Sequence, residues 1–277
     1  MSKRTQVKNR QEEVDVQQPR IETIRSKPDL HKAVTPALNT LIEPEFVELQ
    51  APLIPPRTAA NANNWSGSYA THPPDGFTMI VNASWVVPNV VETAGGLIGQ
   101  PLATWIGLDN TEVPQVAFSA GVSITSMGYG GTYYPFYQWG SYRQVLSNLG
   151  VGAGDTVHVW AMNKLNGGNT VRLLFANVTT GAYWFGDITT PLVLIGATAE
   201  WVVSSTSASI YGIPRYGQVL FGGAWCTDLP PDPPDPNKPP PPIVEPAHDM
   251  TMIDGQGKEI SVGQYIGCKV VQCLSLA

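Results

Sequence analysis

The chain has 277 residues, with 16 basic and 22 acidic side chains and a formal net charge of −6 at pH 7. The segment from Trp65 to Cys226 holds only four basic and seven acidic residues, which excludes the basic footprint of a nucleic-acid-binding domain. No apolar run is long enough to cross a bilayer as a helix, so we expect no membrane insertion.

Residues 1–60 are charged, punctuated by proline, and contain neither Trp nor Tyr. Apart from a short helix near 28–41, we expect a mobile leader or a segment that lies over the domain. The basic N-terminus is not followed by an apolar stretch, so it does not have the pattern of a secretory signal peptide. This observation leaves the localisation open.

Residues 61–226 are predicted to form the packed domain, because all eight tryptophans lie between Trp65 and Trp225. Runs rich in β-branched and aromatic residues alternate there with Gly, Asn, Asp and Pro, which is typical of many short strands. The fold class is therefore all-β, an antiparallel β-sandwich. The expected strands are 77–87, 103–108, 115–126, 132–139, 156–163, 170–177, 181–186, 198–204 and 217–224.

Residues 227–248 are predicted to be a proline-rich linker, since ten prolines fall between 230 and 246. Residues 249–277 then form a short β-like tail, which we expect to act at some distance from the groove. The three cysteines lie at the end of the domain or in the tail, and their spacing fits no zinc pattern. We therefore predict no metal and no cofactor.

Glu200 lies in an apolar strand-like run with little charge nearby. Strand alternation places it on the face opposite Trp201. The same argument puts Ser119 opposite Phe118, on the small, polar face of its strand, which would line solvent or a groove. Burial would raise the pKa of the Glu200 carboxyl and suit it to proton transfer. The alternative is an edge-strand glutamate in solvent.

Several short motifs follow one another along the domain. In chain order they are Asn-Trp-Ser-Gly from residue 64, residues 77–88, Trp-Ile-Gly-Leu-Asp from residue 105, Tyr-Gln-Trp from residue 137, Ala-Gly-Asp from residue 153, Ala-Glu-Trp-Val-Val from residue 199 and residues 216–221. In this order the set resembles the glutamic peptidases, also called eqolisins or the peptidase A4 family. The resemblance covers roughly residues 61–225.

The resemblance implies a sandwich of two bent antiparallel sheets and a secreted, acid-active endopeptidase with a removable propeptide. It would make residues 1–60 a propeptide-like leader. It implies a Gln/Glu dyad in which the glutamate is the general base for water and the glutamine stabilises the oxyanion. The glutamate maps onto Glu200. The glutamine position is occupied by Ser119, whose hydroxyl is shorter than an amide, so the dyad is degraded.

Three interpretations follow. The first is a divergent acid endopeptidase that acts on polypeptide substrates, in which Gln138 or Gln115 supplies the amide or Ser119 holds a water. The second is a catalytically inactive relative that binds extended peptides or glycans. The third is a glycosidase, which needs a second carboxylate opposite Glu200, and Asp109 is the one candidate.

The expected substrate-binding residues combine the family motifs with nearby aromatic side chains suited to stacking. They are Trp65, Trp105, Asp109, Gln138 and Trp139. Asp109 has an equally simple role as a turn or cap residue, and Asp155 is expected to be a turn residue. His158 lies off the core face and is expected to be a surface or satisfied residue.

Overall fold

The computed structural model describes residues 21–22, 58–71, 80–91, 101–111, 113–126, 131–163, 168–205, 213–227 and 243–276. Within these ranges every regular element is a strand, and no helix could span a membrane. The predicted helix near 28–41 and most of the predicted leader and linker lie outside the described residues. The division of the chain into leader, domain, linker and tail stays a prediction.

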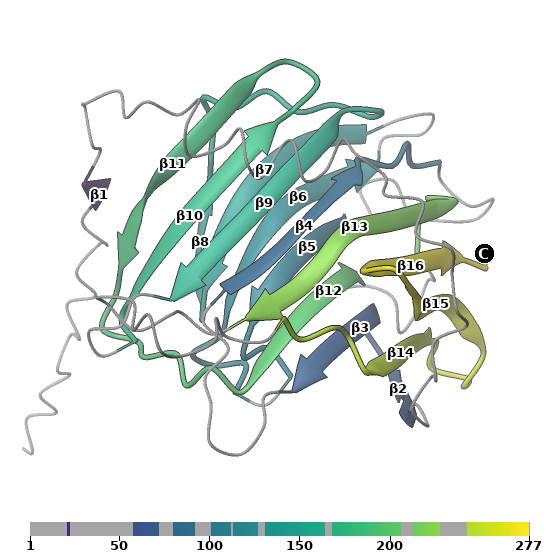
Figure 1. Cartoon of the computed structure of the whole chain (residues 1–277). Coiled ribbons are helices and arrows are strands. Elements are labelled where there is room, and N and C mark those ends of the chain that lie inside the picture. The colour runs from purple at the N-terminus through teal and green to yellow at the C-terminus, as the bar shows by residue number, and fades with distance from the viewer. Residues whose placement is uncertain are drawn as a thin grey trace, which may run out of the picture.

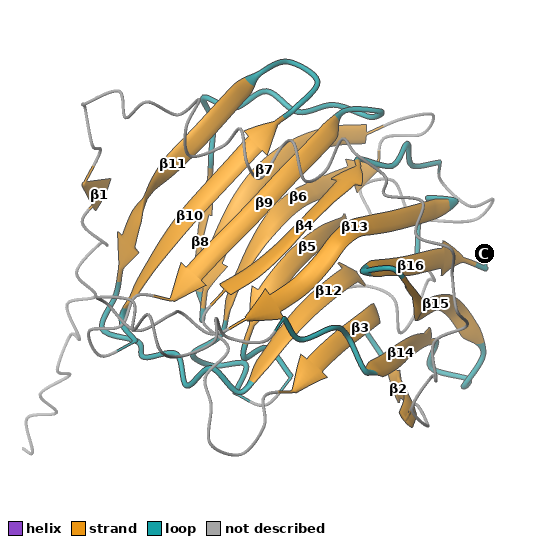
Figure 2. Ribbon diagram, in the orientation of Figure 1, coloured by secondary structure: helices purple, strands orange, loops and turns teal. Residues whose placement is uncertain are grey.

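The strands form two layers that pack face to face (Figures 1 and 2). The front layer of Figure 1 contains β11 (Ala182–Thr189), β10 (Thr170–Asn177), β9 (Thr156–Asn163), β4 (Ile80–Val86) and β13 (Gln218–Thr227), with β1 (Ile21–Glu22) paired to β11. The back layer contains β3 (Trp65–Thr71), β12 (Thr198–Ser204), β5 (Pro101–Leu108), β6 (Phe118–Ser126), β7 (Gly131–Trp139) and β8 (Tyr142–Val145). The predicted antiparallel sandwich is confirmed.

Three C-terminal strands join the two layers along one side. They are β14 (His248–Ile253), β15 (Glu259–Gly267) and β16 (Val270–Ser275). β16 pairs with β13 of the front layer, and β14 pairs with β3 of the back layer. β14 also pairs in parallel with β2 (Thr58–Ala62). The tail is therefore not set apart from the two layers: its strands continue the sheet and supply the partners that the edges of β13 and β3 would otherwise lack.

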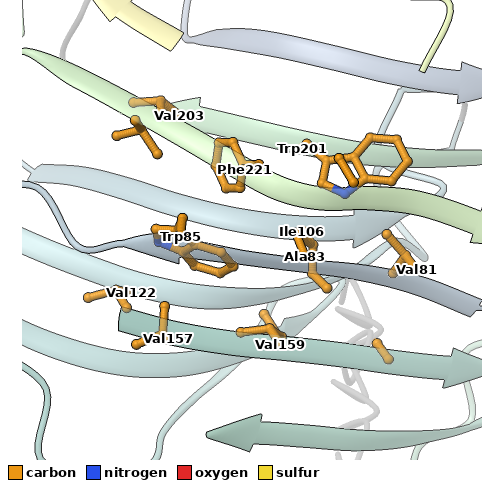
Figure 3. Close-up of a cluster of buried hydrophobic side chains, with 14 of the residues drawn as sticks. Val81, Ala83, Trp85, Ile106, Val122, Val157, Val159, Trp201, Val203 and Phe221 are labelled. Atoms are coloured by element: carbon orange, nitrogen blue, oxygen red, sulfur yellow. The ribbon is translucent and has the colours of Figure 1, made fainter. Parts of the chain in front are cut away.

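The core lies between the layers and consists of alternate side chains from both (Figure 3). Ile106 and Val122 of the back layer face Trp85 and Val157 of the front layer. Each of these four side chains is at most 2% exposed. Because side chains alternate along a strand, the residues between them must point away from this core.

Two tryptophans also connect the layers by hydrogen bonds. The indole N–H of Trp85 on β4 donates to Thr104 Oγ1 on β5 at 2.9 Å, and that of Trp201 on β12 donates to the carbonyl of Asn82 on β4 at 2.9 Å. Both indoles are buried, so each N–H needs such an acceptor.

Replacing Thr104 by Val is expected to lower the free energy of unfolding by about 1–3 kcal/mol, although Val has nearly the same volume. The cost arises because the buried N–H of Trp85 loses its acceptor. Urea unfolding measures it. In a Trp85→Phe background the same substitution should cost nothing, because the donor is gone; an equal cost in both backgrounds would contradict this account.

Candidate active site

The outer face of the back layer carries a row of side chains that crosses five strands. Strand pairing sets Glu200 opposite Gly107, Gly107 opposite Ser119, Ser119 opposite Gln138, and Gln138 opposite Arg143. These residues belong to β12, β5, β6, β7 and β8 in turn. β12 lies between β3 and β5, so the alternative of an edge-strand glutamate in solvent is wrong.

A pocket of about 200 Å³ is hollowed into this face. Two of its lining residues, Trp105 and Phe136, are paired on either side of Gly121, which has no side chain. Its lining residues come from β3, β5, β6, β7, β8, β12 and adjoining turns: Asn64, Trp65, Pro101, Leu102, Ala103, Trp105, Asn110, Ser119, Ser123, Phe136, Gln138, Arg143, Ser204 and Ser205. The predicted residues Trp65, Trp105, Ser119 and Gln138 are therefore brought together here.

Two of these side chains are held in place by hydrogen bonds. The indole N–H of Trp105 donates to Ser204 Oγ at 2.8 Å, which fixes one aromatic wall of the pocket. The amide nitrogen of Gln138 donates to the carbonyl of Gly140 at 2.9 Å. Ser119 is 8% exposed and lies between Gly107 and Gln138, where its hydroxyl can turn toward a ligand.

The carboxyl group of Glu200 is completely buried beside this pocket. Its Oε1 accepts from the backbone N–H of Thr111 at 3.2 Å and from the hydroxyl of Thr111 at 3.3 Å, and it forms a short hydrogen bond with the hydroxyl of Thr198. Its Oε2 accepts from the amide nitrogen of Asn110 at 3.3 Å. Four donors therefore hold one carboxyl group.

Burial raises the pKa of Glu200 from its ordinary value of 4.5 to about 7. The hydrogen bonds from Thr198, Thr111 and Asn110 oppose this rise, and the negative charge of Asp109 adds to it. At pH 7 both the charged and the neutral forms of Glu200 are populated. A group in this state can accept or donate a proton.

Gly107 is what allows Asn110 to reach the carboxyl group. A Cβ atom on Gly107 would lie 2.4 Å from Asn110 Nδ2, 2.7 Å from the Trp105 ring and 3.0 Å from Glu200 Oε2. The space above the glycine is thus filled by all three groups, and any side chain there would displace one. Asn110 lines the pocket and Glu200 does not, so Asn110 is the link between them.

Comparison with known proteins agrees with this geometry. The model of the peptidase A4 family matches residues 63–229, more than half of the chain. The chain belongs to the peptidase A4 family. Among curated proteins, no match was found.

Solved structures of glutamic peptidases share the fold. Scytalido-glutamic peptidase with a transition-state analogue inhibitor is 17% identical, with a TM-score of 0.59 over 77% of this chain and 98% of that one. SCP-B, an eqolisin in complex with the tripeptide Ala-Ile-His, is 16% identical, with a TM-score of 0.55 and the same coverage. Aspergilloglutamic peptidase from Aspergillus niger is 18% identical, with a TM-score of 0.50 over 64% of this chain and 99% of that one.

In this A4-family chain Asp109 does not line the pocket. Its buried carboxylate accepts backbone N–H groups from the 195–198 segment, namely those of Ile195, Gly196, Ala197 and Thr198 at 2.7, 3.0, 2.6 and 3.4 Å. It therefore acts as the turn-stabilising residue that the sequence also suggested, rather than as a substrate-binding residue. A carboxylate saturated in this way is also unsuited to the glycosidase interpretation.

Two other expectations for the pocket are wrong. Trp139 is fully buried on the core side of β7, where its ring packs edge-on against Phe118. Its neighbour Gln138 faces the pocket, and adjacent residues of a strand cannot share a face. Gln115 is exposed in a turn, because β6 begins only at Phe118, so strand alternation does not carry it to the face of Ser119.

His158 is buried, at 3% exposed, and its Nδ1 lies 2.9 Å from the hydroxyl of Ser84. The expectation of a satisfied residue is confirmed. Asp155 is confirmed as a turn residue, since its carboxylate accepts the backbone N–H of Gly152 at 2.8 Å. Neither residue lines the pocket.

Sequence reasoning missed four residues of the site: Asn110, Thr111, Arg143 and Thr198. Asn110 and Thr111 directly follow the Trp-x-Gly-x-Asp motif, and this adjacency was the one available signal. Among the described residues, no group of three His, Cys, Asp or Glu side chains is arranged to hold a metal ion. The polar side chains that line the pocket are hydroxyls, amides, indole N–H groups and one guanidinium group, and the Glu200 carboxyl group lies buried beside it.

Proposed function

We propose that this chain binds an extended polypeptide across the pocket and hydrolyses one of its peptide bonds, with Glu200 as the general base. The observation that carries the proposal is the buried Glu200 carboxyl group, which has four hydrogen-bond donors and a pKa raised to about 7, one glycine away from the pocket. The family assignment and the peptide ligands of SCP-B and scytalido-glutamic peptidase support it.

In the proposed reaction a water molecule attacks the carbonyl carbon of the scissile bond. The ionised Glu200 removes a proton from that water as the new C–O bond forms. The carbonyl oxygen becomes an oxyanion, and the C–N bond then breaks as Glu200 returns the proton to the leaving nitrogen. Atoms and charges balance without a metal ion, and Glu200 is ionised again after one turnover.

The oxyanion needs a hydrogen-bond donor where the family has glutamine. The Ser119 hydroxyl is the proposed donor, because it lies in the same row as Glu200 with only Gly107 between them. Asn110 is proposed to orient Glu200 rather than to replace the missing amide. Its Nδ2 already contacts three acceptors, the carbonyls of Leu108 and Phe118 and Glu200 Oε2, so its two N–H bonds are already used.

The raised pKa of Glu200 shifts the expected pH range of the reaction. A general base must be ionised, so activity should increase as the pH rises through about 7. The resemblance implied an acid optimum. In this chain the rate below that pH should fall about tenfold per unit, because the ionised fraction of Glu200 falls by that factor.

The test is cleavage of a denatured protein from about pH 3 to pH 8, with fragments identified by mass spectrometry. The wild type is expected to cleave slowly, with a rate that rises toward neutral pH. Glu200→Gln should lose about a hundred- to ten-thousandfold, as is usual when a general base is removed. Cleavage that persists unchanged in Glu200→Gln would exclude Glu200 as the base.

A second candidate function is peptide binding without hydrolysis. Two observations favour it: Glu200 has no exposed surface, and Ser119 is too short to reproduce an amide donor at the same place. Under this alternative the wild type and Glu200→Gln would bind peptides equally and cleave none. A labelled-peptide binding assay beside the cleavage assay separates the two functions.

A further inference from the structure

Arg143 is the one ionisable residue among those that line the pocket. It lies at the end of the row that begins with Glu200, directly across from Gln138. Its guanidinium carbon lies 3.9 Å from the centre of the Phe136 ring, so the cation stacks on that ring and extends back over β7 toward the pocket. Phe136 lies on the face of β7 that points away from the core, and yet its side chain is only 2% exposed.

No carboxylate neutralises this guanidinium within the part of the chain that the structure describes. The protein around Arg143 desolvates it and lowers its pKa, but an arginine stays protonated at any pH at which a protein is folded. Arg143 is an exposed residue whose guanidinium is partly desolvated where it stacks on Phe136, and such a cation gains from a ligand that brings a carboxylate.

Arg172 provides a contrast within the same molecule. It also lies near an aromatic ring, with its guanidinium carbon 5.7 Å from the centre of the Phe185 ring. Its Nε and Nη2 bind the two carboxylate oxygens of Asp187 at 2.8 and 3.1 Å. Arg172 is thus paired with an acid on the front layer, whereas among the described residues no acid pairs with Arg143 beside the pocket.

We propose that Arg143 forms a subsite for an acidic side chain, so that the pocket selects polypeptides with Glu or Asp near the bond over Ser119. The guanidinium lies over Phe136 of β7, one strand spacing of about 4.8 Å from β6. Phe136 pairs with Gly121, which is two residues along β6 from Ser119. The acidic residue of the ligand would therefore be about two to three residues from the bond that lies over Ser119. The inference rests on the proposed function only in that a polypeptide occupies the pocket.

The experiment measures binding to the Glu200→Gln variant, so that its result does not depend on hydrolysis. The probes are short fluorescent peptides, blocked at both ends, that differ only by Glu or Gln two or three residues from a central position. The Glu peptide is expected to bind about five- to tenfold more tightly, which corresponds to a partly exposed ion pair. This preference should weaken as salt is added.

Arg143→Gln in the same background should abolish the preference, and Arg143→Lys should keep part of it. Arg172→Gln is the matched control, since it also removes an arginine near an aromatic ring, and it should leave the preference unchanged. An equal Glu-to-Gln ratio with and without Arg143 overturns the proposal. A fluorescent acidic oligosaccharide is tested beside the peptides, and Arg143-dependent binding of that sugar without binding of any peptide also overturns the proposal.

The two proposals can fail separately. If the wild type cleaves nothing while the Arg143-dependent preference persists, hydrolysis is excluded and the acidic subsite is supported. If the wild type cleaves peptides with no preference for acidic residues and Arg143→Gln cleaves the same bonds at the same rate, hydrolysis is supported and the subsite is excluded.

Discussion

Replacing Ser119 by Gln is expected to raise the rate of peptide-bond hydrolysis by about a hundred- to a thousandfold, which is the usual effect of one oxyanion donor on the rate. Ser119 lies on β6 with Gly107 between it and Glu200, so an amide at this position extends into the space above the glycine. A donor that reaches the Glu200 carboxylate would also lower the pKa of Glu200. The pH at which activity rises should therefore move downward together with the gain in rate.

Ser119→Met is the matched control, because Met is similar in length to Gln but carries no amide. It should give no gain. The space above Gly107 already holds Asn110, so a second experiment combines Ser119→Gln with Asn110→Ala. If Ser119→Gln alone does not raise the rate of hydrolysis but the double variant does, Asn110 obstructs the new amide. If neither variant hydrolyses peptides faster than the wild type and both are folded, the assignment of Ser119 to the oxyanion position is contradicted.

The fold could be predicted from the sequence because its signals are local. The strands β9, β10 and β12 span the same residues as predicted, since β-branched and aromatic runs there end at clear turn residues. The position of β14 could not be predicted in this way. Its pairing with β3 joins residues 248–250 to residues 67–69, and no local pattern encodes a contact between such distant segments.

The same limit explains the site. Alternation correctly assigned Glu200 and Ser119 to the outer face, because both lie inside regular strands. It could not find Asn110, which reaches the carboxyl group from a turn whose preceding residue, Asp109, has a φ of 67°. Turn geometry of this kind is set by long-range contacts such as those of Asp109 with the 195–198 segment. The alternation of side chains along a strand carries no information about these contacts.

The stability of the protein is expected to depend on pH through two buried groups that act in opposite directions. Glu200 has a pKa raised from 4.5 to about 7, so between these values the folded state holds a proton that the unfolded chain has released. The contribution of Glu200 to the free energy of unfolding is complete below pH 4.5 and is lost as the pH rises to about 7. The loss is roughly 3 kcal/mol at 1.36 kcal/mol per pKa unit.

For His158 the sign is reversed. Burial lowers its pKa from 6.5 to about 4, so in this range the unfolded chain binds a proton that the folded state does not. Its contribution is present above pH 6.5 and is lost as the pH falls to about 4. The size is again roughly 3 kcal/mol, so the two effects should nearly cancel in the wild type and leave stability almost flat between about pH 4.5 and 6.5.

Single substitutions separate the two contributions. In Glu200→Gln only the histidine remains, and the free energy of unfolding should rise by roughly 3 kcal/mol from about pH 4 to pH 6.5. In His158→Asn only the glutamate remains, and the free energy of unfolding should fall by a similar amount from about pH 4.5 to pH 7. Urea unfolding at several pH values measures both slopes. Because the two slopes must be opposite in sign, variants that shift stability equally at every pH would show that neither group titrates on folding as its burial requires.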